Sequence, residues 1–169
     1  MDRRPLGFAA ALYLALVLWA TLGPVPWRTA TNEAAGGILN PASWTSAATW
    51  STGYLAEIAF NVAMFVPLGV LAALLLPRRA WPIAVLAGVA ATTAIELAQL
   101  PMPDRVSDPR DLVANSAGAL IGVVLVLAAR RVRRAASVTV LQGADAGSTP
   151  SPADAESTLI AAGAPDRAA

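Results

Sequence analysis

Four long apolar runs constrain this chain more than any other feature of its sequence. They cover residues 6–22, 55–76, 81–100 and 112–129. Each run is long enough for a helix to cross a hydrocarbon core of about 30 Å. Strands are excluded, because an isolated apolar strand would leave its backbone groups unpaired in lipid. The sequence therefore predicts an all-α membrane protein with four transmembrane helices arranged in two hairpins.

The distribution of arginine predicts how these helices are oriented. All 12 basic residues are arginine, and most of them lie in short clusters beside the apolar runs. An N-terminus inside the cell places in the cytoplasm the eight that lie in these clusters: Arg3, Arg4, Arg78, Arg79, Arg130, Arg131, Arg133 and Arg134. Only Arg28, Arg105 and Arg110 then lie outside. The positive-inside rule thus predicts a multi-pass protein of the cell membrane with both termini cytoplasmic.

The remaining segments complete the predicted organisation. The first run has a basic flank but no small-residue cleavage site after it, so we interpret it as a retained anchor. In the outer loop 24–54, Asn40-Pro41 is typical of a helix start and predicts a short interfacial helix from Pro41 to about Thr49. Residues 135–169 are rich in small and polar residues, which predicts a disordered cytoplasmic tail after a membrane domain formed by residues 1–134.

The composition excludes several kinds of chemistry. The chain contains no Cys and no His, so disulfides, thiolate chemistry, histidine-based catalysis and most zinc sites are ruled out. The net charge of +1 comes from scattered clusters and does not indicate nucleic-acid binding. Carboxylates, arginine, tyrosine, hydroxyls and amides remain as reactive groups. We therefore predict no cofactor and no metal site, and an enzymatic role is less favoured than a non-enzymatic one.

Polar residues gather near the predicted outer ends of the second, third and fourth apolar runs. Asn61, Glu96 and Asn115 each lie roughly 5 to 10 Å below the outer boundary, given the rise of a helix per residue. Because polar groups are costly in lipid, we expect them to turn inward and meet. The predicted cluster consists of Asn61, Glu96, Gln99, Arg105, Asp108, Asp111 and Asn115.

Each of these residues also has a purely structural interpretation. Asp108-Pro109 is typical of a helix N-terminus, so Asp108 is expected to act at least as an N-cap. The amides of Asn61, Gln99 and Asn115 can join helices by hydrogen bonds. Glu96 needs a partner inside an apolar helix. A structural pair with Arg105 is the alternative to a functional site at Glu96. Helix packing accounts for Pro67, Gly69, Gly118 and Gly122.

The sign of the cluster limits what it can bind. Five acidic residues face only two arginines: Glu57, Glu96, Asp104, Asp108 and Asp111 against Arg105 and Arg110. Such a cluster favours a cationic amine or a divalent cation. A phosphate would need the helix N-terminus near Leu112, which Asp108 is expected to occupy.

The ordered set of polar and small residues resembles a known family. Asn61-x-x-x-Phe65-x-Pro67-x-Gly69, Glu96-x-x-Gln99 and Arg105-x-x-Asp108-x-x-Asp111-x-x-x-Asn115-x-x-Gly118-x-x-x-Gly122 resemble the VanZ-like family of bacterial membrane proteins. That family is named for a protein associated with resistance to the glycopeptide antibiotic teicoplanin. The resemblance implies a small multi-span protein acting at the cell envelope, and it assigns no catalytic residue.

Three functions stay open at this point. The first is a non-enzymatic envelope protein whose outward polar pocket engages a cell-wall precursor, a lipid or a glycopeptide. The second is a membrane-embedded enzyme that acts on a lipid-linked envelope substrate through Glu96 with Asp108 or Asp111. The third is a small transporter or a membrane scaffold for partner proteins, and the absence of charged residues at mid-membrane depth argues against the transporter. Membrane lipids are partners in all three, nucleic acid in none, and the sequence leaves the oligomeric state open.

Overall fold

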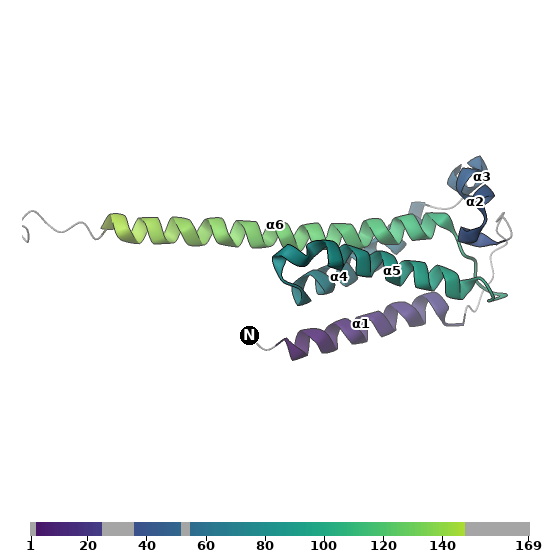
Figure 1. Ribbon diagram of the computed structural model, residues 1–169, viewed down its shortest axis with the longest axis horizontal. Coiled ribbons are helices and arrows are strands. Elements are labelled where there is room, and N and C mark those ends of the chain that lie inside the picture. The colour runs from purple at the N-terminus through teal and green to yellow at the C-terminus, as the bar shows by residue number, and fades with distance from the viewer. Residues whose placement is uncertain (1–2, 25–35, 52–54, 148–169) are drawn as a thin grey trace, which may run out of the picture. The chain divides into compact units, whose positions relative to one another are not determined.

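Every regular element in the part of the chain that the structure describes is a helix. The computed structural model describes residues 3–24, 36–51 and 55–147. The elements are α1 (Arg4–Leu22), the 3₁₀ turn η1 (Gly37–Leu39), α2 (Pro41–Thr45), α3 (Ala47–Ser51), α4 (Leu55–Leu75), the 3₁₀ turn η2 (Arg78–Ala80), α5 (Trp81–Gln99) and α6 (Pro109–Gly147) (Figure 1). The predicted all-α class is confirmed.

Among the described residues, four helices are long and apolar enough to cross a membrane. They are α1, α4, the stretch Arg78–Gln99 that contains α5, and Pro109–Ser137 of α6. Their surfaces carry many exposed apolar side chains, among them Phe8 at 72%, Trp19 at 70% and Leu55 at 81% exposed. Surfaces of this kind suit lipid rather than water. The four predicted membrane helices are therefore confirmed.

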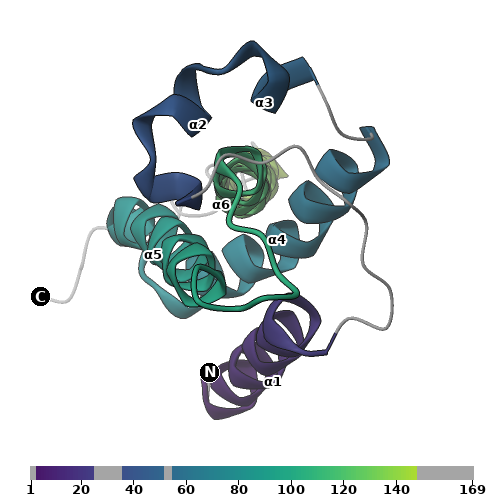
Figure 2. The same cartoon turned by 90° about the vertical axis from the view of Figure 1, so that its right-hand side faces the viewer.

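The chain divides into two compact units, Met1–Ala129 and Arg130–Ala169, and α6 contributes to both. In the first unit α4 packs against α1 and α5, and α1 also packs against α5. Figure 2 looks at this unit from the end where α5 stops and α6 begins. The Tyr13 hydroxyl of α1 donates to the Met64 carbonyl of α4 at 2.8 Å. One buried apolar cluster joins all four membrane helices through Val17, Phe65, Ile95 and Ala119.

Glycine residues let α4 and α6 approach until their backbones touch. A methyl group on any of three glycines would lie within 2.3 Å of a carbonyl oxygen on the facing helix. These are Gly69, Gly118 and Gly122. Small residues at helix interfaces allow such contact between backbones in membranes. The close approach at the three glycines is consistent with the packing role expected for them, and Pro67 lies within α4, half-buried, beside this contact.

The two ends of the helical bundle in the first unit differ in chemistry. At one end Arg3 donates to the Leu75 carbonyl at 2.9 Å, so the start of α1 meets the end of α4, and Arg78 and Arg79 follow in the chain. The opposite end holds the end of α1, the start of α4, the end of α5, the loop 100–108 and the start of α6. We call it the polar end. All seven residues of the predicted cluster lie there.

The segment between α1 and α4 departs from the prediction in one detail. The Asn40 side chain caps α2 as expected, because its Oδ1 accepts from the Ala42 N–H at 3.0 Å. The single helix expected from Pro41 to about Thr49 is, however, broken at Ser46, whose backbone is extended. Short isolated helices are marginal, and one non-helical residue is enough to divide them. Trp27 and Arg28 lie outside the described residues.

The helix α6 also runs farther than the sequence pattern predicted. It continues to Gly147 and so includes residues 135–147, which the composition placed in a disordered tail. Residues 135–142 contain neither Pro nor Gly, so helical hydrogen bonding propagates beyond the membrane stretch. Residues 148–169, the rest of the predicted tail, lie outside the described residues.

Candidate functional site

Glu96 carries the most deeply buried ionisable group at the polar end. Its side chain is 1% exposed, and Oε2 accepts from the backbone N–H of Asp108 at 2.9 Å. The side chain of Ser107 is a second polar group that interacts with this carboxylate. A buried carboxylate needs such donors to offset lost hydration. The loop 100–108 therefore folds back over the end of α5 and holds Glu96 with its own backbone.

Arg105 does not form the structural pair with Glu96 that the sequence offered. Its Nη2 instead donates to the carbonyl oxygens of Ala20, at 3.2 Å, and Gly23. The last carbonyls of a helix lack intrahelical partners and carry partial negative charge, which attracts a cation. The end of α1 thus competes for the guanidinium, and Glu96 is satisfied by Asp108. The sequence alone does not indicate that Arg105 binds the end of α1, because α1 lies far from Arg105 along the chain.

Gln99 joins Arg105 in holding the end of α1. Its Nε2 donates to the Thr21 carbonyl at 3.0 Å, and its side chain is only 7% exposed. Together, Gln99 and Arg105 bind three carbonyls in the last turn and the cap of α1. The third predicted membrane helix and its following loop therefore fix the first helix at the polar end.

Asp108 acts as the N-cap of α6, as its sequence position predicted. Its Oδ1 accepts from the backbone N–H of Arg110 at 2.8 Å. Its Oδ2 accepts from Arg110 Nε at 2.9 Å and forms an ion pair with Nη2 of the same side chain. Asp108 is 5% exposed. One carboxylate thus satisfies an orphan helix donor and neutralises an arginine.

Two amides join α6 to its neighbours. Asn61 of α4 donates through Nδ2 to Asp111 Oδ1, and Asn115 of α6 donates through Nδ2 to Thr92 Oγ1 of α5 at 3.0 Å. Both bonds lie in the half of the bundle that carries Glu96. The interhelical bonding predicted for Asn61, Gln99 and Asn115 is therefore present for all three residues.

The charge of the polar end is negative overall. Asp108 and Asp111 both act electrostatically on Glu96, and Glu57 and Arg110 act on Asp111. Four carboxylates therefore share one region with the guanidinium of Arg110, while Arg105 is directed to α1. Within the described residues, no three acidic side chains are grouped so that they could hold a metal ion. Such a field favours a positively charged or hydrogen-bond-donating group.

Three buried atoms of this cluster have no hydrogen-bond partner among the residues that the structure describes. They are Gln99 Oε1, Asn115 Oδ1 and Arg105 Nε. Gln99 and Asn115 follow the same pattern, since each uses its NH₂ group to bind another helix and leaves its carbonyl oxygen unused. Buried polar atoms are normally paired, so these atoms are the ones available to water or a ligand.

Sequence reasoning missed three residues that shape this site. Thr92 accepts from Asn115, Ser107 faces Glu96, and Gly37 packs against Ser107 so closely that a methyl group would lie 2.5 Å from its Cβ. A signal existed for Thr92, which lies four residues before Glu96 and hence on the same helix face. Ser107 and Gly37 lie in loops, where no periodicity indicates a partner.

Comparison with known proteins adds one positive finding. A family model described as VanZ/LLP1 matches residues 10–130, which contain α4 and α5 in full, parts of α1 and α6, and every residue of the polar cluster. No curated protein matches the chain, and no solved structure does.

Proposed function

The chain belongs to the VanZ/LLP1 family, and on that premise we propose that it is a non-enzymatic accessory protein of the cell envelope. In this proposal the polar end binds a cell-wall precursor, a lipid or a glycopeptide, and the protein lowers susceptibility to teicoplanin. The chain is a multi-pass membrane protein with four membrane helices. The proposal concerns what its polar end does there.

One observation carries the proposal. Side chains from α4, α5, α6 and the loop 100–108 converge at a single end of the bundle, and three of their buried atoms have no partner within the described part of the chain. A brace that served packing alone would leave fewer such atoms, because each unpaired buried group costs about 1–3 kcal/mol. The unused atoms support a role in which a ligand completes the hydrogen bonding.

The chemistry of these atoms indicates the ligand's groups. Gln99 Oε1 and Asn115 Oδ1 are acceptors beside Glu96, so they suit an amine or amide N–H. Arg105 Nε is a donor and suits a carbonyl or carboxylate oxygen. A peptide-like molecule that carries both an amine and carbonyl groups matches this set. Glycopeptides and the peptide portions of cell-wall precursors both have that chemistry.

We propose that the polar end faces the outside of the cell. Arg3, Arg78 and Arg79 lie at the opposite end of the bundle, and arginine near membrane helices favours the cytoplasmic side. Both termini are then cytoplasmic. Reporters that are active only in the cytoplasm, fused to either terminus, should be active. An inactive reporter at both ends would reverse this orientation and place the polar end inside.

The functional test compares susceptibility in a teicoplanin-sensitive host. Wild type should reduce susceptibility relative to the empty vector. Glu96→Gln and Arg105→Ala should abolish this reduction at equal membrane expression, because one replaces the central carboxyl group and the other removes a donor. Gly7→Ala is the matched control, since a methyl group at Gly7 has nothing within 4 Å and lies far from the polar end. Equal susceptibility with and without the wild type would contradict the resistance role.

An enzyme that acts on a lipid-linked envelope substrate is the second candidate. Asp108 and Asp111 act electrostatically on Glu96, so the carboxyl groups that an acid/base mechanism would use lie in one region. Asp108 is already engaged by Arg110, and Asp111 by Asn61, so neither is free in this arrangement. A phenotype that survives the triple change Glu96→Gln, Asp108→Asn, Asp111→Asn would exclude the enzyme and favour a scaffold.

A further inference from the structure

The segment between α1 and α4 has an exposed apolar surface and no charge. Residues 36–51 contain no Asp, Glu, Lys or Arg. Three large apolar side chains in this stretch are exposed: Leu39 at 66%, Trp44 at 37% and Trp50 at 49%. On a surface in contact with water, such a stretch would be expected to carry charged side chains. Its composition is that of a surface in contact with lipid.

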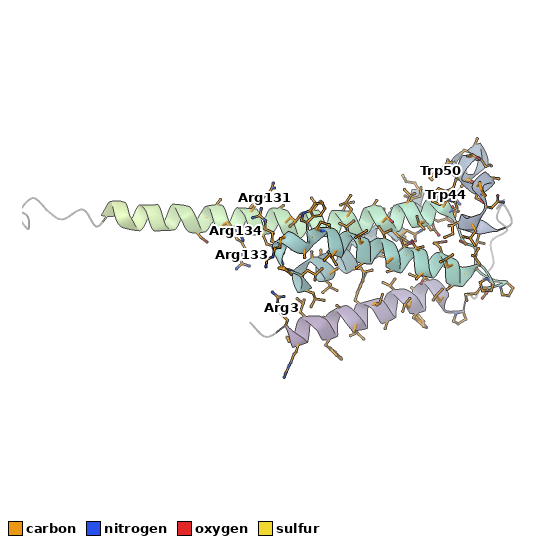
Figure 3. The ribbon with its side chains drawn as sticks, viewed as in Figure 1. Arg3, Trp44, Trp50, Arg131, Arg133 and Arg134 are labelled. Carbon is orange, nitrogen blue, oxygen red and sulfur yellow. The ribbon has the colours of Figure 1, made fainter. Side chains whose placement is uncertain are left out.

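The two tryptophans of this segment satisfy their own indole N–H groups. Trp44 lies in α2 and Trp50 in α3 (Figure 3). Trp44 Nε1 donates to the Ile38 carbonyl at 2.9 Å, and Trp50 Nε1 donates to the Trp44 carbonyl at 2.9 Å. Tryptophan ordinarily stays at the headgroup level because its N–H needs a polar partner while its ring is apolar. Here the partner is supplied by the segment itself. The rings can therefore enter the hydrocarbon without leaving a donor unpaired.

The opposite side of the segment is fixed to the bundle. The backbone N–H of Ile38 donates to Ser107 Oγ at 3.3 Å, and Gly37 approaches Ser107 and Leu100 so closely that a methyl group would clash with both. Ser43 of α2 is 3% exposed. The segment thus has one side bound to protein and one side, with Leu39 and the two indoles, that faces away.

We propose that residues 36–51 form a membrane-docking surface whose partner is the acyl-chain region of the bilayer. Leu39, Trp44 and Trp50 enter the lipid, and both indole rings lie below the headgroups. The next described element, α4, begins at Leu55, an 81% exposed apolar residue of a membrane helix, so lipid is close along the chain. This inference rests on residues 36–51 and their contacts alone, and it stands whatever the polar end binds.

Depth-dependent fluorescence quenching tests the proposal on the full chain. The protein has five tryptophans. Three single-tryptophan variants, made by changing the other four to Phe, retain Trp44, Trp50 or Trp81. Each is reconstituted into phosphatidylcholine vesicles with bromine placed either high or low on the acyl chain, and each is also titrated with aqueous acrylamide. Circular dichroism before and after reconstitution shows that the helices are retained.

Trp81 is the matched control because it is 45% exposed at the start of α5 and lies outside residues 36–51. We expect Trp44 and Trp50 to emit at shorter wavelength than Trp81, to lose more intensity to the deeper bromine, and to be protected from acrylamide. Quenching of Trp44 and Trp50 by acrylamide as strong as for an indole in water would overturn the proposal.

Two further results would also overturn it. Equal bromine profiles for all three tryptophans would place Trp44 and Trp50 at headgroup level, and their internal hydrogen bonds would then have no consequence for depth. Protection from acrylamide without any bromine quenching would mean that protein, not lipid, covers them. As a second measurement, Leu39→Asp should restore acrylamide access to Trp44, because a carboxylate resists entry into hydrocarbon. Leu39→Asn is the uncharged control.

Discussion

Moving a single methyl group between α5 and α6 tests the packing of the membrane helices. A methyl group on Gly88 would lie 2.5 Å from the Ala119 Cβ, and the next nearest atom, the Ala119 Cα, is 3.9 Å away. Gly88→Ala therefore creates one clash, with a methyl group that a second substitution can remove. Ala119→Gly removes that methyl and leaves an ordinary contact. The double variant carries the same atoms at the interface, with the methyl on the other helix.

The two single variants should each lose stability. Ala119 is fully buried, so Ala119→Gly costs about 0.8 kcal/mol for the methyl and about 0.5–1 kcal/mol for glycine within a helix. Gly88→Ala costs about 1–3 kcal/mol for overpacking, reduced by up to about 1 kcal/mol of helix propensity. In the double variant the clash is gone, and the helix-propensity gain at position 88 cancels the helix-propensity loss at position 119. We expect a favourable coupling of roughly 1–2 kcal/mol between the two changes.

Gly69 supplies the contrasting case at the same alanine. A methyl group on Gly69 would lie 2.1 Å from the Ala119 carbonyl oxygen and 2.8 Å from its carbon, both backbone atoms. Ala119→Gly leaves those atoms in place. Gly69→Ala should therefore destabilise the protein by about 1–3 kcal/mol, and Ala119→Gly should not rescue it. Gly7→Ala, which meets nothing within 4 Å, measures the helix-propensity term alone.

Each pair of substitutions forms a double-mutant cycle. Equilibrium unfolding in mixed micelles with rising SDS, followed by circular dichroism, gives the free energy of unfolding of the wild type, the two single variants and the double variant. Rescue of Gly88→Ala by Ala119→Gly, together with no rescue of Gly69→Ala, is the expected pair of results. If the first cycle is additive, α5 and α6 are not in contact at this point. If Ala119→Gly rescues both variants equally, α6 has shifted as a whole and the atomic argument fails.

Three further predictions concern the polar end and use the same unfolding assay. Arg105→Ala should lower the free energy of unfolding by about 1.5–3 kcal/mol, because two carbonyls at the end of α1 lose a charged donor. Arg105→Lys should be intermediate, and an Arg105→Ala variant as stable as the wild type would contradict this. Asn61→Asp should destabilise more than Asn61→Leu at neutral pH, since it sets a second carboxylate against Asp111, and the gap should close on acidification; a gap independent of pH would refute the contact. Asp108→Ala should lower the free energy of unfolding by about 0.5–2 kcal/mol and speed hydrogen exchange of the Arg110 backbone amide. Asp108→Asn should keep the N-cap and lose only the ion pair. Equal exchange rates in the two variants would argue against the cap.

Local rules were enough to predict the features that depend on neighbouring residues. Asn40-Pro41 and Asp108-Pro109 start helices in the structure, because an N-cap needs only an acceptor placed before the first turn. The spacing of Gly118 and Gly122 predicted a contact face for the same reason, since helical periodicity places both on one side. These predictions required no knowledge of which helix lies opposite.

The partners of buried charges could not be predicted in this way. Arg105 lies nine residues from Glu96 and more than eighty from Ala20, yet it binds the end of α1. The choice depends on where α1 ends in space and on the unpaired carbonyls it exposes there, which only the assembled bundle determines. The helical structure of residues 135–147 was not predicted, for a related reason. A composition rich in small and polar residues predicted disorder, whereas helix propagation depends on what precedes the segment.

The hydrogen bonds at the polar end bear on whether it is a brace or a binding site. An amide has a donor end and an acceptor end, and the two can serve different purposes. Gln99 and Asn115 each use the donor end to join two helices and leave the acceptor end buried and unpaired. The helix contacts therefore fix the position of the free oxygens, much as a supporting shell orients a ligand-binding group. A ligand that reached these oxygens would find them held in place by α1, α5 and α6. The structural and functional interpretations of these residues are thus compatible. A change that removes the acceptor oxygen but keeps the donor to the neighbouring helix distinguishes ligand binding from helix bracing.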